Sequence, residues 1–160
     1  MLRPLFLLCT SALLLGTLAA SVVAAGDGTG GTAAPLLTRE KLYDIVFVGE
    51  REAWVAGYPG ILLHTVDGGS SFIRVSAGTD DAVYALAFPE PGRGFAVGRG
   101  GLILATLDGG RTWSRRETGT GEHLFSIAFA DQRRGVAVGS FGTVARTADG
   151  GATWTVTTLE

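Results

Sequence analysis

Sulfur is nearly absent from this sequence, and its position limits what it can do. The 160 residues include one methionine and one cysteine, Cys9, which lies in an apolar segment at the N-terminus. If that segment is removed, the remaining chain holds no thiol. Disulfides, thiol catalysis and cysteine-based metal sites are then excluded.

An excess of charge of either sign is also missing. The sequence has 13 Lys and Arg against 15 Asp and Glu, a net charge of −2. No basic field indicates nucleic-acid binding, and no charge run indicates an interaction tail. The two histidines, His64 and His123, have no partners at metal-ligand spacing, and we interpret His64 as a surface or edge residue. We therefore predict no metal, no cofactor and no nucleic-acid partner.

Residues 1–25 are typical of a secretory signal peptide. Arg3 gives a minimal positive start, residues 5–18 form an apolar run, and residues 23–25 (Val-Ala-Ala) resemble a cleavage site for small residues. This pattern predicts an extracytoplasmic protein, which is periplasmic, lumenal or secreted.

A second interpretation of the same segment is an uncleaved anchor. Residues 5–25 carry no charge and are long enough to span a bilayer, so a membrane would be a partner in that case. We favour cleavage, because Ala, Ser and Thr dilute the second half of the segment. Residues 26–37 follow as a flexible linker rich in Gly, Thr and Ala.

Glycine is abundant, with 25 residues, and much of it belongs to an internal repeat. One stretch occurs three times, at Gly60–Phe72, Gly101–Trp113 and Gly142–Trp154, without insertions. Equivalent residues are 41 positions apart. A period of about 40 residues with several short strands in each copy is typical of β-propeller blades.

Each copy contains four strand-like segments. In the first strand of the second copy, large residues (Tyr84, Leu86) alternate with small ones (Ala85, Ala87), which suits blades stacked face to face. In the first copy, Asp44 breaks this rule and is expected either to face a solvent channel or to cap the blade. We predict an all-β domain over residues 38–160, with three four-stranded blades. Their approximate ranges are 42–76, 83–117 and 124–159, and the predicted fourth strands are Ser71–Ser76, Thr112–Arg116 and Thr153–Thr158.

Every copy carries the pattern Thr-x-Asp-x-Gly-x-Ser/Thr-aromatic, known as the Asp-box or BNR repeat. A short carboxylate can accept hydrogen bonds from backbone N–H groups of its own turn, and glycine supplies positive φ. We interpret these residues as structural, since three turns on separate blades do not converge on one ligand. They are Thr65, Asp67, Gly69 and Phe72; Thr106, Asp108, Gly110 and Trp113; and Thr147, Asp149, Gly151 and Trp154.

A longer pattern carries a family resemblance. Gly-aromatic-Ala-Val-Gly-x-x-Gly followed by Thr-x-Asp-Gly-Gly-x-Thr-Trp resembles the photosystem II stability/assembly factor family over about residues 42–157. The resemblance implies a non-enzymatic, extracytoplasmic propeller that binds partner proteins during assembly or stabilisation, hence a role linked to photosynthesis. The first copy departs from the pattern at Ala53 and Phe72, which indicates a divergent terminal blade.

The loops where the copies differ are the candidate partner-binding surface. Tyr58, Arg99 and Phe141 lie between the second and third strands and should share one end of the blades. Arg93 and Arg134 lie in turns at the opposite end, where an arginine cluster could hold an acidic partner. The alternative for these arginines is an ordinary solvated turn.

Two other functions remain open. Asp-boxes also occur in sialidase-like glycoside hydrolases, but Glu90, Glu117 and Glu122 form no recognisable catalytic pair. A carbohydrate-binding surface could use Tyr58 and Phe141, together with Trp54 if that residue is not in the core. We predict that the protein is not an enzyme.

The number of blades is too small for a closed ring. Propellers have four to eight blades, so three blades form an incomplete propeller. Either two copies pair head to tail into six blades, or the chain is a fragment of a longer propeller. Left alone, it would expose two apolar faces, so we predict self-association.

Overall fold

The computed structural model of the protein describes residues 40–160. The predicted signal peptide and linker, residues 1–25 and 26–37, lie outside that part. Between residues 40 and 160 there is no helix long and apolar enough to cross a membrane.

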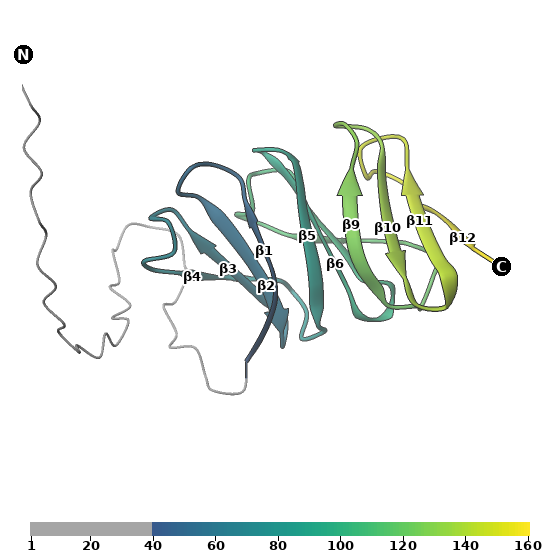
Figure 1. Cartoon of the computed structure of the whole chain (residues 1–160), viewed down its shortest axis with the longest axis horizontal. Coiled ribbons are helices and arrows are strands. Elements are labelled where there is room, and N and C mark those ends of the chain that lie inside the picture. Colours follow the sequence, from purple (N-terminus) through teal and green to yellow (C-terminus); the bar gives the residue numbers. More distant parts are fainter. Residues whose placement is uncertain (1–39) are drawn as a thin grey trace, which may run out of the picture.

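Twelve strands form three four-stranded antiparallel sheets, which we call blades 1, 2 and 3. In each blade the strands pair in chain order, and the blades follow one another side by side (Figure 1). The all-β fold with three four-stranded blades is therefore confirmed, and the row is not closed into a ring. Blade 1 contains β1 (Lys41–Phe47), β2 (Ala53–Tyr58), β3 (Ile61–Thr65) and β4 (Ile73–Ser76). Blade 2 contains β5 (Val83–Glu90), β6 (Arg93–Gly98), β7 (Ile103–Thr106) and β8 (Ser114–Arg116), and blade 3 contains β9 (Leu124–Phe129), β10 (Gly135–Gly139), β11 (Thr143–Thr147) and β12 (Thr155–Thr158). Short 3₁₀ turns, η1 (Arg99–Gly101) and η2 (Ser140–Gly142), stand where loops were predicted.

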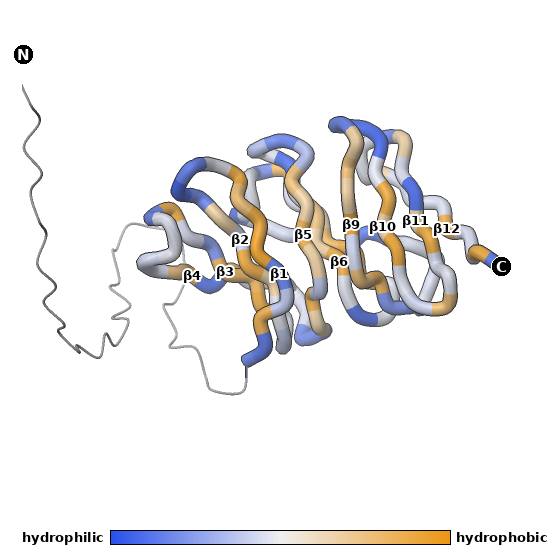
Figure 2. Tube along the Cα trace, viewed as in Figure 1, coloured by the Kyte–Doolittle hydropathy of each residue, from blue (hydrophilic) through white to orange (hydrophobic). Residues whose placement is uncertain are grey.

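The blades pack through complementary faces. We call the side of a blade that faces its predecessor the back face, and the opposite side the front face. Leu86 on the back of β5 packs with Trp54 on the front of blade 1, and Ile127 on the back of β9 packs with Ala85 on the front of blade 2. The side of each inner strand that carries its large residues thus packs against the front face of the preceding blade. Burying such a side chain contributes about 1.5–3 kcal/mol to the stability of the fold. Figure 2 shows that the hydrophobic residues lie along the strands.

At each junction between blades, an aromatic ring of one blade lies against a glycine of the next blade. A Cβ added to Gly110 would overlap the six-membered ring of Trp54, and one added to Gly151 would overlap the ring of Phe95. Both aromatic side chains are fully buried. The Asp-box glycine therefore also leaves the space into which the aromatic ring of the preceding blade packs.

Two predictions made from the sequence need correction. The fourth strands begin at Ile73, Ser114 and Thr155, two residues later than predicted. The reason is that Ser71, Thr112 and Thr153 bind the Asp-box carboxylate and so belong to the turn.

Asp44 neither faces an open channel nor simply caps blade 1. Its carboxylate accepts the backbone N–H of Leu86 in blade 2 at 2.8 Å and that of Ile45 at 2.9 Å. A small polar side chain on the front of β1 therefore ties the inner strand of one blade to that of the next.

Candidate partner-binding surface

Each Asp-box carboxylate accepts three hydrogen bonds from its own turn. Asp108 Oδ1 accepts the N–H of Thr112 at 2.9 Å and the hydroxyl of Thr106 at 2.7 Å, while Oδ2 accepts the hydroxyl of Thr112 at 2.7 Å. Asp67 and Asp149 have the same three bonds in their own turns.

These hydrogen bonds favour the ionised carboxylates. The N–H and then the hydroxyl of Thr112 lower the pKa of Asp108 to about 2, and the hydroxyl of Thr153 is the main cause that lowers the pKa of Asp149 to about 2. The pKa of Asp67 is lowered further, chiefly by the hydroxyl of Ser71. A lowered pKa keeps these carboxyl groups ionised near neutral pH, which makes them poor general acids.

The rest of the box is equally occupied. The hydroxyl of Thr106 accepts the N–H of Gly110 at 2.8 Å, and Trp113 Nε1 donates to the carbonyl of Gly110 at 3.1 Å. Gly109 N donates to the carbonyl of Gly92 at 2.9 Å, which ties the box to the turn between β5 and β6. These hydrogen bonds join the residues of the box to one another and to the neighbouring turn.

The loops that carry Tyr58, Arg99 and Phe141 lie at the end of the blades opposite the Asp-boxes, at the lower end in Figure 1. All three side chains are exposed. Each loop is anchored by a backbone bond to the connector that leads into a neighbouring inner strand; Arg99 N, for example, donates to the carbonyl of Ala82 at 2.9 Å. The three side chains therefore stand on rigid turns at one end of the molecule.

Phe141 is the most unusual residue of this end. It has φ 51° and ψ 41°, in the left-handed region, and its side chain is 83% exposed. The equivalent residue of the preceding repeat is Gly100, at φ 64°. A bulky residue in this region is strained, and such strain concentrates at functional sites. The sequence already indicated this strain, since Phe141 stands where the preceding repeat has Gly100.

The arginines of the opposite end are engaged within the molecule. Arg134 Nε donates to Asp131 Oδ2 at 2.7 Å, and backbone N–H groups of Arg134 and Arg133 lower the pKa of Asp131 to about 2. Arg93 donates to the carbonyl of Gln132 in the next blade at 3.3 Å, and its Nε lies 3.3 Å from Glu90 Oε1. An acid three residues earlier thus accompanies each arginine, which does not favour a free cationic cluster.

Trp54 and His64 belong to the interior of the junction between blades 1 and 2. Their rings stack with centroids 4.3 Å apart, and His64 Nε2 lies 2.9 Å from Glu52 Oε1. Since Trp54 is buried, it does not provide a sugar-stacking surface. His64, which we expected at the surface or at an edge, is partly buried, with 22% of its side chain exposed.

Sequence reasoning missed two features. The first is a row of aromatic rings on the inner strands, where Tyr84 lies 5.4 Å from Tyr43 and 5.6 Å from Phe125 between ring centroids. The 41-residue spacing of these residues was the available signal.

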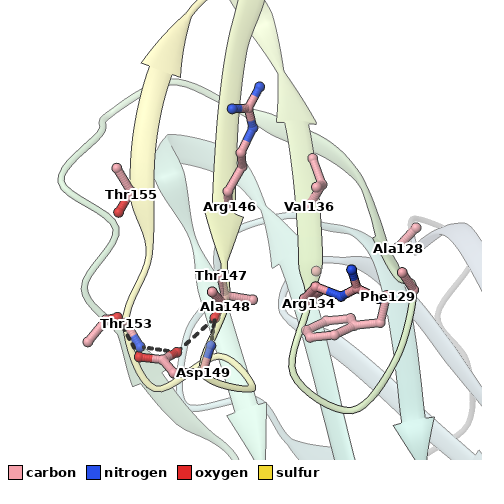
Figure 3. A pocket seen from close by; sticks show the side chains of 12 residues that line it. Ala128, Phe129, Arg134, Val136, Arg146, Thr147, Ala148, Asp149, Thr153 and Thr155 are labelled. Carbon is pink, nitrogen blue, oxygen red and sulfur yellow. Dashed lines mark hydrogen bonds between the residues drawn. The ribbon is translucent and has the colours of Figure 1, made fainter.

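The second is a cavity of about 730 Å³ on the front face of blade 3, where Val136 on β10 and Arg146 on β11 stand side by side (Figure 3). Asp149 is the one carboxylate among the residues that line it, and Thr147 and Thr153 already bind it. Glycoside hydrolysis needs two carboxyl groups across a pocket, and this cavity does not supply them. Within residues 40–160 no three His, Cys, Asp or Glu side chains gather as a metal site requires.

Comparison with known proteins identifies the repeat. The family model described as photosynthesis system II assembly factor YCF48 matches residues 74–160. None of the curated proteins matches the chain in sequence.

Three solved structures share the fold. The structure of YCF48 bound to D1 peptide has a TM-score of 0.66 and 24% identity, and the match covers 89% of this chain and 47% of that one. YCF48 from Cyanidioschyzon merolae has a TM-score of 0.64 and 23% identity, over 76% of this chain and 41% of that one. An ancestral GH74 enzyme has a TM-score of 0.60 and 15% identity, over 71% and 18%. At these identities the likeness shows the fold alone, and the chain spans less than half the length of either YCF48 structure.

Proposed function

Because the chain belongs to the photosynthesis system II assembly factor YCF48 family, we propose that it is a non-catalytic module that binds a segment of a partner protein. Binding would serve the assembly or stabilisation of that partner, in an extracytoplasmic compartment reached through the signal peptide predicted at residues 1–25. A YCF48 of the same fold is bound to D1 peptide, which supports a polypeptide as the kind of ligand.

The observation that carries the proposal is the strained, exposed Phe141 on the same end as Arg99 and Tyr58. An aromatic ring held on a rigid turn gives apolar contact at a low entropic cost. Arg99 adds donors for a carboxylate or for backbone carbonyls. Together they suit an extended segment with an apolar side chain beside an acidic group or a free C-terminus.

The chemistry of the carboxylates supports a non-enzymatic role. The three Asp-box carboxylates are bound within their turns, and Glu90 and Glu122 have partners in Arg93 and Ser140. Turnover of fluorogenic glycosides by the purified chain, abolished by one carboxylate substitution, would overturn this part of the proposal.

Binding is tested with labelled peptides that tile the D1 sequence, followed by fluorescence anisotropy. We expect at least one peptide to bind, with Kd raised about tenfold by Phe141→Ser and by Arg99→Glu. Leu107→Ser is the matched control, because Leu107 is an exposed apolar residue on an Asp-box turn at the other end. If the peptides bind equally well to all variants, the surface is wrong; if a glycan array gives the only binding, the ligand class is wrong.

A further inference from the structure

The inner strand of every blade has a β-bulge at the same place, and the extra residue is aromatic in each blade. On β5 the residues on either side of Tyr84 pair with consecutive residues of β6, so Tyr84 is the extra residue. Tyr43 on β1 and Phe125 on β9 are the extra residues of their own strands. Bulges often redirect a side chain beside a functional site, so the role of these three rings needs an explanation.

The bulge takes each ring out of the regular alternation of its strand. Ala85 packs in the cluster between blades 2 and 3, whereas Val83 and Leu86 both pack in the cluster between blades 1 and 2. Without the bulge, Tyr84 would share the side of Leu86 and Val83 would lie on the other side. Tyr84 is half-buried although a blade flanks it on each side. Its exposure is therefore a property of the inner strand and does not come from the end faces of blades 1 and 3.

A glycine of the second strand makes each bulge possible. A Cβ on Gly98 would overlap the carbonyl oxygen of Ala82, and a Cβ on Gly139 would overlap that of His123. The backbones of the two strands can approach this closely only because no side chain stands between them. The repeated glycine therefore sets the bulge, and with it the ring, in the sequence of the blade.

The three rings form a row across the inner strands, which lie side by side (Figure 1). Neighbouring rings have centroids 5.4 and 5.6 Å apart and are tilted by 62° and 48° to one another. Two hydrogen bonds hold the blades together near this row. Across the first junction Asp44 accepts the N–H of Leu86 at 2.8 Å, and across the second junction His123 Nδ1 accepts the N–H of Gly100 at 3.1 Å. A surface held in place in this way loses little entropy when it binds a ligand.

His123 also connects this aromatic row to the candidate partner-binding surface. Its ring lies 6.4 Å from Tyr84 and 6.2 Å from Phe125 between centroids. The side chain of His123 bonds to η1, the turn that carries Arg99. Its backbone carbonyl accepts an N–H of η2, the turn that carries Phe141, at 2.9 Å. The row and the exposed loops therefore form one continuous surface.

From this arrangement we infer that an extended polypeptide segment crosses the inner strands on the aromatic row, with proline or aromatic side chains against Tyr84 and Phe125. The inference rests on the peptide-binding proposal and adds the course and the side-chain chemistry of the segment. Rings tilted to one another present edges and faces in turn, which suits edge-to-face contact with aromatic side chains and contact with proline. A sugar stacks on a flat aromatic face, and the tilts of 62° and 48° interrupt such a surface.

The test uses the labelled peptides that tile the D1 sequence, with anisotropy measured on the full chain and on three variants, Tyr84→Ala, Phe125→Ala and the conservative Tyr84→Phe. For the tightest peptide we expect Kd to rise about tenfold with each Ala variant and to stay within about twofold with Tyr84→Phe, which keeps the ring. Leu107→Ser, at the other end of the blades, is again the control. Replacement of the proline and aromatic residues of the peptide by Ala should weaken binding to the unmodified chain, with little further effect on Tyr84→Ala.

A second measurement needs no substitution in the protein, so a folding defect of an Ala variant does not decide the outcome. A benzophenone group replaces one proline or aromatic side chain of the bound peptide, and light attaches it to the nearest part of the unmodified chain. Mass spectrometry of the digested product should find the attachment on β5 or β9.

The possible results separate this inference from the proposal on which it rests. If Phe141→Ser and Arg99→Glu weaken binding while both Ala variants bind as before, the loops hold the peptide and the row is wrong. If only the Ala variants weaken binding, the row is right and the loop surface is wrong. Attachment outside the three inner strands overturns the row. A chain that binds no peptide overturns both proposals, and binding to a glycan array that Tyr84→Ala abolishes would mean that the row holds sugars.

Discussion

Phe95 of blade 2 lies over Gly151 of blade 3 so closely that a Cβ on the glycine would overlap the ring. Trp54 and Gly110 repeat the relationship one junction earlier. The Asp-box glycine thus has two tasks, since it provides positive φ for its own turn and a socket for its neighbour. The two tasks can be separated by substitution.

Gly110→Ala should lower the free energy of unfolding by about 3 kcal/mol, because positive φ costs an L residue about 1–2 kcal/mol and the overlap adds a similar amount. Gly109→Ala is the control, since Gly109 is also at positive φ (71°) but a Cβ there would meet only ordinary contacts. It should lose about 1 kcal/mol. Urea denaturation measures the free energy of unfolding of both variants. Equal losses would show that the packing of Trp54 does not require a glycine at position 110.

Trp54→Ala should lower the free energy of unfolding by about 3–5 kcal/mol, since it empties a buried junction. Val136→Ala, at the same repeat position on the front of blade 3, should lose less than about 1 kcal/mol in the monomer, because a half-exposed side chain leaves little cavity. Thermal melts at low protein concentration compare the two. A large loss at Val136 under these conditions would mean that something already covers the front face of blade 3.

Acid should unfold the protein as the Asp-boxes are protonated. The pKa of Asp108 is lowered to about 2 in the folded chain, below the value of about 3.9 of an unfolded Asp. The stabilisation it contributes is therefore fully present above about pH 4 and is lost as the pH falls toward 2. Thr112→Val removes a hydroxyl that lowers this pKa, so acid unfolding should begin at a higher pH.

Thr112→Ser is the matched control for that experiment, because Ser71 provides the same hydroxyl in blade 1. Its acid unfolding should follow that of the unmodified chain. Circular dichroism between pH 6 and 2 gives the midpoints. An unchanged midpoint for Thr112→Val would mean that the hydroxyl does not set the protonation of Asp108.

Phe141→Gly should stabilise the chain by up to about 1 kcal/mol, because relief of left-handed strain exceeds the entropy that glycine adds to the unfolded state. The same substitution should weaken peptide binding. Phe141→Ala keeps most of the strain and should leave stability nearly unchanged while it also weakens binding. A Gly variant that is less stable would show that the ring of Phe141 is part of the fold rather than a contact for a partner.

The 41-residue period explains why so much of the fold could be predicted. Thr106, Asp108 and Trp113 mark one hairpin, and two equivalents fix the remaining strands by position alone. The predicted start of the fourth strand was wrong because a Ser or Thr residue can lie in a strand or in a turn. Here the hydroxyl bonds to the Asp-box carboxylate, which keeps the residue in the turn. Asp44 was misplaced because its partner, the N–H of Leu86, belongs to another blade.

The candidate site was less accessible to such reasoning. Arg93 and Arg134 form an apparent pair in the sequence, yet Arg93 is half-buried and each arginine lies beside an acid of its own turn. The repeat position of Trp54 favoured the core over a sugar-binding surface, but that it packs at the junction with blade 2 is visible only when the next blade is in place. The cavity at Val136 depends on the smaller side chain at that position and on the lack of a further blade among residues 40–160, and a single strand pattern carries neither.

The ring-on-glycine junction also makes the 41-residue unit interchangeable. The front face of each unit carries the aromatic ring, or Val136 in its place, and the back face carries the Asp-box glycine. A segment that runs between equivalent positions, from Val83 to the residue before Leu124, therefore has two faces that complement each other. Duplication of residues 83–123 would lengthen the row by one blade, and no new packing solution would be required. Proteins of this architecture can therefore gain or lose one blade at a time during evolution, and at every length the faces of neighbouring blades remain complementary.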